Sequence, residues 1–316
     1  MTAGDAAFVH LRALQAIADR NGGNRALGTP GYDRSVDYLA DTLRRAGFRV
    51  ETPEFPIVIG GDSDTEEESG SRPAGGTTRN VIAQTTTGRP EEVVLAGAHL
   101  DSVPVGPGID DNGSGAAALL EIALKLGSAP PVANSVRFVW FGAEEEGLLG
   151  SQHYLRTLSA EQRRDIALML NADVIAAPNA GYFVYDGDNS NGGGTTGPPG
   201  SAAIEKILAD HLASLGARPA GFPFIDDSDY GPFVNAGIAT GGVFSGDSGI
   251  KTPEQAATWG GRPGVPYDPC YHRACDTVAN IDRVALDRML DTLAFGIGSF
   301  ATDLGGVPSR NQRTTG

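Results

Sequence analysis

The spacing of apolar residues predicts two amphipathic helices near the start of the chain. Apolar positions recur every three to four residues within residues 6–19, as in Leu11, Leu14 and Ile17, and the same pattern returns within residues 33–46. Two later stretches are predicted to be helices that cover a sheet: residues 116–126 and 282–300.

Short apolar runs bounded by turn residues predict four buried strands. They span residues 80–83, 93–98, 136–141 and 168–170. Continuous apolar runs of this length are typical of strands covered on both faces of a parallel sheet. Because strands alternate with helices, we expect an α/β fold with a single-domain, open, mostly parallel mixed sheet and helices on both faces.

The composition narrows the choice of partners. A chain of 316 residues with 40% hydrophobic residues is long enough to bury a sizeable core. Its formal net charge of −15 argues against nucleic acid and anionic membranes and favours metal ions and cationic substrates. The N-terminal sequence MTAGDAAFVHLRAL lacks the pattern of a signal peptide, so the protein is expected to be either cytosolic or already processed.

Two stretches rich in Gly, Ser and Pro predict surface loop insertions, at residues 60–78 and 187–200. The first carries an acidic run, which we interpret as a solvated loop rather than a site for calcium or a basic partner. We expect one catalytic domain over residues 1–304 and a flexible tail over residues 305–316.

Candidate metal ligands directly follow three of the predicted strands. They are His99 in GAHLDS, Glu144 and Glu145 in WFGAEEEG, and Asp173 in LNAD. Carboxyl ends of parallel strands meet at one edge of a sheet, where ligands bind in such folds. Asp111 in GIDDNGSG and His272 in CYHRAC complete a set of imidazoles and carboxylates, which a pair of divalent metal ions needs. The sequence therefore predicts a two-metal hydrolase.

The two cysteines of the chain, Cys270 and Cys275, flank His272. A disulfide between them would pin the loop that carries a metal ligand and would indicate an oxidising compartment. The alternative is a pair of free thiols beside a metal.

Six ordered motifs closely resemble the secreted di-zinc aminopeptidases of the Streptomyces type. The motifs are NGGNRALGTPGY at 21–32, GAHLDSV at 97–103, GIDDNGSG at 108–115, FGAEEEGLLGS at 141–151, PNAGYFVYD at 178–186 and CYHRACDT at 270–277. The wider peptidase family also contains glutaminyl cyclases and glutamate carboxypeptidases. The resemblance implies a zinc-exopeptidase fold, the Cys270–Cys275 disulfide, secretion with any leader absent from this sequence, and a monomer.

The resemblance also implies roles for individual residues. One zinc ion would be held by His99 and Asp173, the other by Glu145 and His272, and Asp111 would bridge them. Asp101 would fix the orientation of the His99 ring. Glu144 would be the general base, and the hydroxyl of Tyr271 would donate to the oxyanion, unless this tyrosine is simply packed in the fold.

The substrate pocket is where the chain departs from these relatives. Phe244 matches an aromatic wall of the pocket for the first side chain, which implies large apolar first residues. Asp226 and Asp227 stand near a position where the relatives carry an arginine. We therefore expect better acceptance of Lys or Arg as the first residue, although a solvated acidic loop is the simpler interpretation.

Asp287 and Asp291 match residues that bind calcium in Streptomyces relatives. They are four residues apart on the last predicted helix and thus share a face. The third acid of that site would align near Met1, with Asp5 the nearest candidate. Two carboxylates fall short of the six to eight oxygens of a calcium site, so calcium is a candidate cofactor beside the two zinc ions.

Three functions compete at this stage. The first is a di-zinc aminopeptidase acting on the N-termini of peptides and proteins. The second is another zinc hydrolase or cyclase of the same fold, a carboxypeptidase or a glutaminyl cyclase. The third is a non-catalytic binding protein on a peptidase fold, which should have lost ligands or Glu144. Since the five candidate ligands and Glu144 are all present, the aminopeptidase function is favoured.

Overall fold

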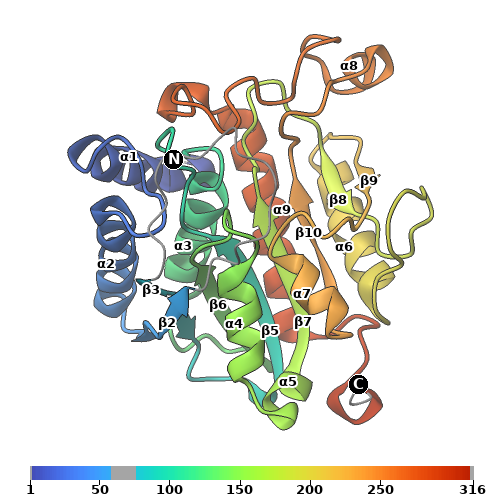
Figure 1. The fold of residues 1–316 in the computed structure, drawn as a ribbon. Helices are drawn as coiled ribbons and strands as arrows, with labels where there is room; N and C mark the ends of the chain where they lie inside the picture. Colours follow the sequence, from blue (N-terminus) through green and yellow to red (C-terminus); the bar gives the residue numbers. More distant parts are fainter. Residues whose placement is uncertain (1, 58–75, 314–316) are drawn as a thin grey trace.

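Within the residues that the structure describes, eight strands form one mixed sheet (Figure 1). The computed structural model describes residues 2–57 and 76–313. The strands follow the order β1 (Arg49–Glu51), β4 (Val81–Gln84), β6 (Asn134–Phe141), β5 (Arg89–His99), β7 (Ile166–Asp173), β10 (Ala239–Phe244), β8 (Phe183–Tyr185) and β9 (Ala220–Phe222). The four central strands, β6, β5, β7 and β10, are parallel. Their carboxyl ends therefore lie at one edge of the sheet.

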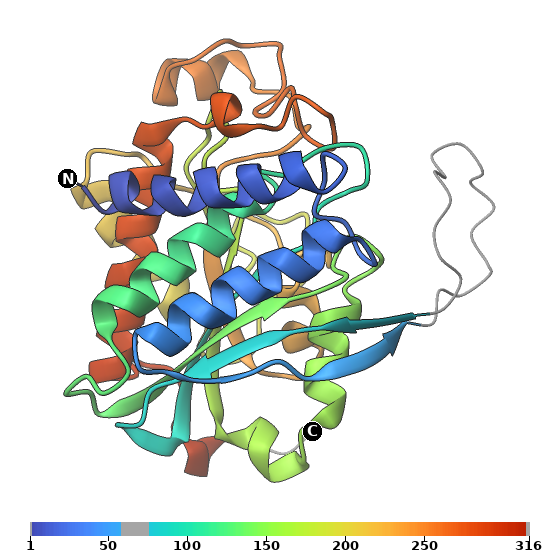
Figure 2. The same ribbon diagram turned by 90° about the vertical axis from the view of Figure 1, so that its left-hand side faces the viewer.

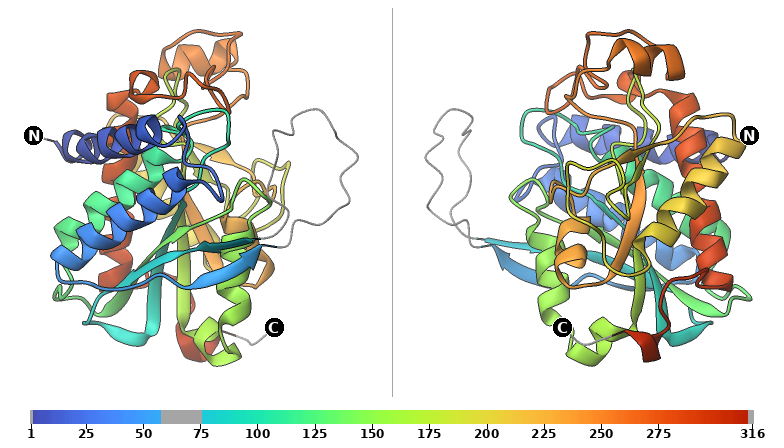
Figure 3. Two further views of the ribbon diagram at one scale, coloured as in Figure 1. Left: turned by 60° about the vertical axis from the view of Figure 1, so that its left-hand side comes forward. Right: turned by 90° about the vertical axis from the view of Figure 1, so that its right-hand side faces the viewer.

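Helices cover both faces of this sheet (Figures 2 and 3). One face carries α1 (Ala3–Arg20), α2 (Pro30–Arg45), α3 (Gly113–Leu126), α6 (Ser201–Ser214) and α9 (Arg283–Thr302). The other face carries α4 (Leu149–Thr157) and α7 (Tyr230–Asn235). Two short helices lie toward the ends of the sheet: α8 (Pro253–Trp259) at the top of Figure 1 and α5 (Ala160–Asp165) at the bottom.

Alternation along β5 explains its continuous apolar run. Val94 and Ala96 belong to the core beneath α1, α3 and α9, whereas Val93 and Leu95 belong to the core on the opposite face. Successive side chains of a strand point to opposite faces, and here both faces are covered. All four residues are fully buried. The predicted fold class is thereby confirmed.

The start of α3 brings one candidate ligand close to another. Asn112 caps this helix by accepting a hydrogen bond from the backbone N–H of Gly115, and its amide donates to the carbonyl of Ala172 at 2.8 Å. A Cβ on Gly115 would lie 2.2 Å from that carbonyl oxygen, so only glycine permits this approach. The cap thus ties Asp111, joined to Asn112 by a cis peptide bond, to the end of β7.

The predicted helices and strands agree with the structure, and the bounds differ by a few residues. The strand predicted at 168–170 is longer, because the whole of β7 is buried. Residues 76–78, which were predicted to be loop, belong instead to β3 (Gly76–Arg79), which pairs with β2 (Glu54–Ile57) in a ribbon that projects from the body (Figure 2). Residues 60–75 of that loop are outside the described residues. The second predicted loop, 187–200, contains no helix or strand.

The segment predicted as a flexible tail is held to the body up to Arg313. Two short 3-10 helices occur late in the chain, η1 (Val278–Asn280) and η2 (Arg310–Gln312). Arg310 pairs with Asp165 at 2.6 Å, and Arg313 pairs with Glu92 at 2.6 Å. The domain boundary at residue 304 stays a prediction. None of the helices in the described part of the chain is long and apolar enough to cross a membrane.

Candidate metal centre

Three parallel strands deliver candidate ligands to the same edge of the sheet. His99 is the last residue of β5 and Asp173 is the last residue of β7, while Glu144 and Glu145 follow the end of β6. Register along the sheet aligns these strand ends, since His99 pairs with Phe141, the last residue of β6. The loops after these strands gather at the top of the sheet in Figure 1.

Asp111 lies at the centre of the group. Its Oδ1 is 3.1 Å from Nε2 of His99, and its Oδ2 is 3.0 Å from Nε2 of His272. The side chain is almost completely buried. A single carboxylate therefore faces two imidazoles, one at the end of β5 and one in a loop, that are more than 150 residues apart in the sequence.

A further carboxylate lies beside each imidazole. Oδ1 of Asp173 is 3.3 Å from Nε2 of His99, and Oε2 of Glu145 is 3.2 Å from Nε2 of His272. Glu144 lies slightly farther away, with Oε2 at 3.8 Å from Nε2 of His99. The arrangement has two halves that share Asp111.

Two of the candidate ligand atoms have no hydrogen-bond partner among the described residues, as expected for atoms that bind a metal ion. Oε1 of Glu145 and Oδ1 of Asp173 are buried and accept no hydrogen bond from any described residue. Ligand atoms of His99, Asp111 and Glu145 lie within 4.8 Å of one another, and so do those of His99, Glu144 and Asp173. Buried carboxylates without a counter-ion are costly, and nitrogen and oxygen ligands of this kind suit zinc.

The electrostatics of the group follow from burial and crowding. Burial raises the pKa of Glu144, and the neighbouring Glu145 and Asp173 carboxylates add to this against the opposing effect of His99. Burial opposes charge on His99, but Asp173 and Glu144 outweigh it and raise the pKa of the imidazole. The buried carboxylates therefore lack enough nearby positive charge in the metal-free protein, and a bound metal ion would supply it.

Asp101 supports two candidate ligands at once. Its fully buried carboxylate accepts hydrogen bonds from the backbone N–H groups of Glu144 at 3.2 Å and Glu145 at 3.3 Å. Nδ1 of His99 lies 3.2 Å from the Asp101 carbonyl and 3.7 Å from its carboxylate. Asp101 therefore fixes the imidazole and the Glu144–Glu145 backbone together.

Three supporting residues escaped the sequence reasoning. Ser228 donates from its hydroxyl to Oδ2 of Asp173 at 2.7 Å. Asp276 accepts from the backbone N–H of Asp111 at 3.0 Å, and so holds the central carboxylate in place. The fully buried Arg25 donates to backbone carbonyls between the first two ligands of the chain. Arg25 and Asp276 lie inside motifs quoted above, but nothing in their local sequence indicates a contact with the site.

The loop that carries His272 is closed by a disulfide. Cys270 and Cys275 are bonded, with Cα atoms 5.3 Å apart, so the alternative of free thiols is wrong. His272 has a φ of 55°, and the ring of Tyr271 stacks on its imidazole with centroids 4.0 Å apart. Burial, followed by the charges of Asp111 and Glu145, raises the pKa of Tyr271, so its hydroxyl keeps its proton.

A small pocket opens directly onto the group. Candidate ligands and Glu144 line it together with aromatic and acidic side chains. The lining residues are His99, Asp111, Glu144, Asp173, Val174, Tyr185, Phe222, Asp227, Ser228, Phe244, Asp247 and Tyr271. Asp227 and Phe244 were predicted here, and Asp247 was missed. Asp226 and Asp227 are both exposed residues, but Asp226 is not part of the lining, and its carboxylate lies 3.5 Å from the amide nitrogen of Asn235.

The predicted calcium ligands have protein partners in the structure. Asp287 accepts a hydrogen bond from the backbone N–H of Gly4 at 2.9 Å, and Asp291 pairs with His211 at 3.0 Å. Asp5 pairs with Arg283 instead. Among the described residues, neither Asp287 nor Asp291 joins a group of three possible metal ligands. The calcium site stays a prediction without support from the geometry.

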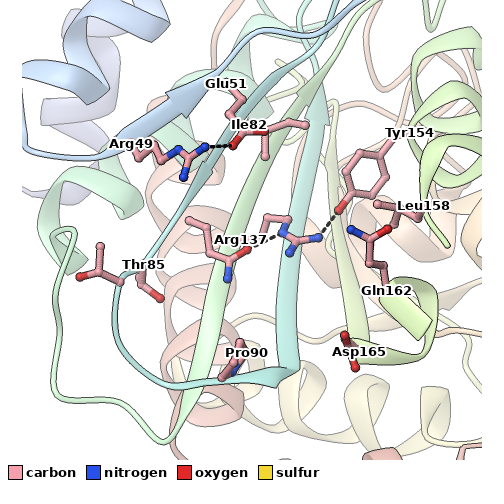
Figure 4. Close-up of a pocket in the computed structure, with 12 residues that line it drawn as sticks. Arg49, Glu51, Ile82, Thr85, Pro90, Arg137, Tyr154, Leu158, Gln162 and Asp165 are labelled. Atoms are coloured by element: carbon pink, nitrogen blue, oxygen red, sulfur yellow. Dashed lines mark hydrogen bonds and ion pairs between the residues drawn. The ribbon is translucent and has the colours of Figure 1, made fainter. Parts of the chain in front are cut away.

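A separate hollow lies toward the amino ends of the parallel strands (Figure 4). At its centre Arg137 donates to Gln84 at 2.7 Å and to the hydroxyl of Tyr154 at 2.6 Å, while Arg49 pairs with Glu51 at its rim. These polar groups are therefore satisfied by one another. The hollow is remote from the candidate ligands and offers no comparable chemistry.

Comparisons with known proteins show which family the chain resembles. Residues 80–296 match the family described as Peptidase family M28. The chain is 36% identical to the probable lipoprotein aminopeptidase LpqL of Mycobacterium tuberculosis, over 98% of this chain and 88% of that protein. It is 52% identical to an aminopeptidase of Pseudomonas aeruginosa, over 88% of this chain and 50% of that protein. It is 40% identical to leupeptin-inactivating enzyme 1 of Streptomyces exfoliatus, over 97% of this chain and 64% of that protein.

The chain thus spans about half to two thirds of the length of two of these three relatives. Solved structures agree in fold. A zinc aminopeptidase from Bacillus subtilis superposes with a TM-score of 0.73 at 20% identity, over 97% of this chain and 98% of that one. A glutaminyl cyclase from Porphyromonas gingivalis superposes with a TM-score of 0.69 at 22% identity, over 94% of this chain and 98% of that one.

Proposed function

The chain belongs to peptidase family M28, and on this premise we propose that it is an aminopeptidase that hydrolyses the N-terminal residue from peptides at a two-zinc centre. In this proposal the zinc ligands are His99 and Asp173 on one side, Glu145 and His272 on the other, and Asp111 between them. The relatives named above as aminopeptidases support the reaction class.

The position of Asp111 carries the proposal. One carboxylate with an oxygen 3.1 Å from one imidazole and the other oxygen 3.0 Å from a second is what a pair of metal ions needs as a bridge. Two zinc ions would bring four positive charges, which would offset the negative charge of the three buried ligand carboxylates and of the neighbouring Glu144.

Glu144 is the general base of this proposal. When bound, the zinc pair makes hydroxide available near neutral pH and polarises the scissile carbonyl. Glu144 takes the proton of the attacking water and returns it to the leaving amine. Glu144 lines the pocket and its Oε2 lies 3.8 Å from Nε2 of His99, so the carboxylate is beside the place that the metal ions and the attacking water would occupy.

Tyr271 and the acids of the pocket position the substrate. Tyr271 lines the pocket and its hydroxyl stays protonated, so it can donate a hydrogen bond to the oxyanion as negative charge develops. Glu144 and Asp173 also line the pocket, where their negative charge attracts the free α-ammonium group of a peptide. A substrate with a blocked N-terminus would lack this attraction, which accounts for cleavage from the amino end.

The disulfide supports an extracellular location, because disulfides persist in oxidising compartments. We propose secretion on this ground. The monomeric state and the absence of a nucleic-acid or membrane partner stay predictions from charge and resemblance.

The proposal is tested by metal analysis and by peptide hydrolysis. Purified protein should contain about two zinc ions per chain and release leucine from leucine p-nitroanilide, and a chelator should abolish this activity. Glu144→Gln should keep the zinc content while kcat falls by about 10²- to 10⁴-fold. The aminopeptidase assignment would be refuted if zinc-loaded protein hydrolysed neither leucine p-nitroanilide nor peptides with a free N-terminal leucine.

A further inference from the structure

Two carboxylates in the pocket are left without a role by the proposed chemistry. Of the acids that line it, Asp111 and Asp173 are assigned to the metal ions and Glu144 to proton transfer. Asp227 and Asp247 remain. They come from different parts of the chain, since Asp227 lies between β9 and α7, and Asp247 follows β10.

Each of these two carboxylates is held through one oxygen. Oδ1 of Asp227 accepts a hydrogen bond from the hydroxyl of Tyr230, and Oδ1 of Asp247 accepts one from the backbone N–H of Gly249 at 2.8 Å. Within residues 2–57 and 76–313, no hydrogen bond reaches the second oxygen of either group. The carboxylates are therefore oriented, and each keeps an acceptor for a ligand.

Aromatic rings enclose the space next to these acids. Phe222 and Phe244 contact each other with ring centroids 4.6 Å apart, and Tyr185 lies against Phe222 at 6.2 Å. All three line the pocket. Rings of this kind pack well against the methylene groups of a long side chain, whose polar tip can then reach a charged partner.

The pocket lacks a positive charge of its own to balance the two acids. Among the described residues that line it, there is no lysine or arginine, and its one histidine is an assigned metal ligand. Asp227 is exposed as a residue, but desolvation of its carboxylate raises its pKa, and the nearby Asp173 and Asp247 carboxylates add to this against the opposing hydrogen bond from Tyr230. A cation entering the pocket would relieve this crowding of negative charge.

We propose that Asp227 and Asp247 select substrates whose first residue is lysine or arginine. The aliphatic stem of that residue packs against the rings of Phe222 and Phe244, and its cationic end meets the two carboxylates. This inference rests on the proposed aminopeptidase function and specifies its substrate class.

Lysine and norleucine amides separate charge from size, because both side chains carry the same four-carbon stem. The experiment measures kcat/KM for lysine, norleucine and leucine p-nitroanilides on the zinc-loaded protein. We expect lysine to exceed norleucine in the wild type. Asp227→Asn and Asp247→Asn should each lower the lysine-to-norleucine ratio by about three- to tenfold, and the double variant should lower it further. Asn at position 227 can still accept the Tyr230 hydrogen bond, so folding is preserved.

Asp226→Asn is the matched control, because it removes the same charge one residue away from Asp227 but outside the pocket. It should leave the ratio unchanged. A wild-type ratio at or below one, or equal effects of the Asp226 and Asp227 variants, would overturn the inference. If no amide is hydrolysed at all, the proposed function itself fails, whereas hydrolysis of leucine with no response to either pocket variant rejects the specificity alone.

Discussion

Replacing Arg25 with methionine tests whether a buried cation stabilises the fold against the crowded carboxylates of the candidate metal centre. The guanidinium group is fully buried and donates from Nε to the carbonyl of Pro107 at 2.8 Å and from its other nitrogens to the carbonyls of Leu100 and Gly108. These carbonyls belong to the segment between His99 and Asp111. Burial lowers the pKa of Arg25, but Asp101, Asp276, Asp111 and Glu145 offset this, so it remains a cation beneath the ligands.

Methionine keeps most of the buried volume but removes the charge and three hydrogen bonds. An unpaired buried carbonyl costs roughly 1–3 kcal/mol, and loss of one partner from a buried charge group costs about 3–5 kcal/mol. These effects overlap, so we expect the free energy of unfolding of the metal-free protein to fall by about 3–5 kcal/mol. With an unfolding entropy of roughly 2.1 cal/mol/K per residue over 316 residues, Tm falls by about 5–8 °C.

Thermal unfolding with and without zinc separates the charge from the hydrogen bonds. Zinc ions would neutralise the same acids, so the Tm loss of Arg25→Met should be smaller in the zinc-loaded protein than after chelation. Arg25→Lys retains the charge with poorer hydrogen-bond geometry and should fall between wild type and Arg25→Met in the metal-free state. Equal Tm losses with and without zinc would show that the charge of Arg25 has no role and would refute this reasoning.

Three further changes address the site itself. Tyr271→Phe should lower kcat for leucine p-nitroanilide by about 10²- to 10³-fold with little change in KM, and an unchanged kcat would remove Tyr271 from the oxyanion site. The double variant Cys270→Ser and Cys275→Ser frees the loop of His272 and should weaken zinc binding, as measured by competition with a chromogenic chelator, whereas wild-type affinity would mean that the loop is held without the disulfide. The Asp276 carboxylate accepts hydrogen bonds from two backbone N–H groups, and Asp276→Asn replaces it by an amide. All five candidate zinc ligands are kept in this variant, but zinc affinity should fall by about 10- to 100-fold. Wild-type zinc affinity in this variant would contradict the positioning role.

The central strands β5, β6 and β7 were predictable because each contains a nearly continuous apolar run. β5, β6 and β7 are buried on both faces, and burial of this kind leaves a continuous apolar run in the sequence. β10 escaped because Gly241 and Gly242 interrupt its pattern. A Cβ on Gly242 would lie 2.1 Å from the carbonyl oxygen of Asn171, so the glycine reflects a close approach to β7 that only the three-dimensional structure reveals.

The candidate ligands were predictable for a different reason, which does not extend to the residues around them. A ligand at the end of a parallel strand has a position fixed by the sheet, as for His99 and Asp173. Arg25 and Asp276 form hydrogen bonds with backbone groups of loops that are distant in the sequence, and the pattern of apolar residues does not predict such contacts.

The acids of the segment IDDSDY show why charge alone does not predict specificity. Three carboxylates stand within four positions, yet the turn sends each to a different environment. Asp226, with a φ of 61°, is exposed and outside the pocket, Asp227 is exposed but lines the pocket, and Asp229 is fully buried. The partner that Asp227 gains in the pocket is Asp247, whose own surroundings, SGDSGI, are typical of an ordinary turn. The number of acids in a loop therefore says little about substrate charge, because two carboxylates become a selective pair only when separate loops bring them to the same cavity.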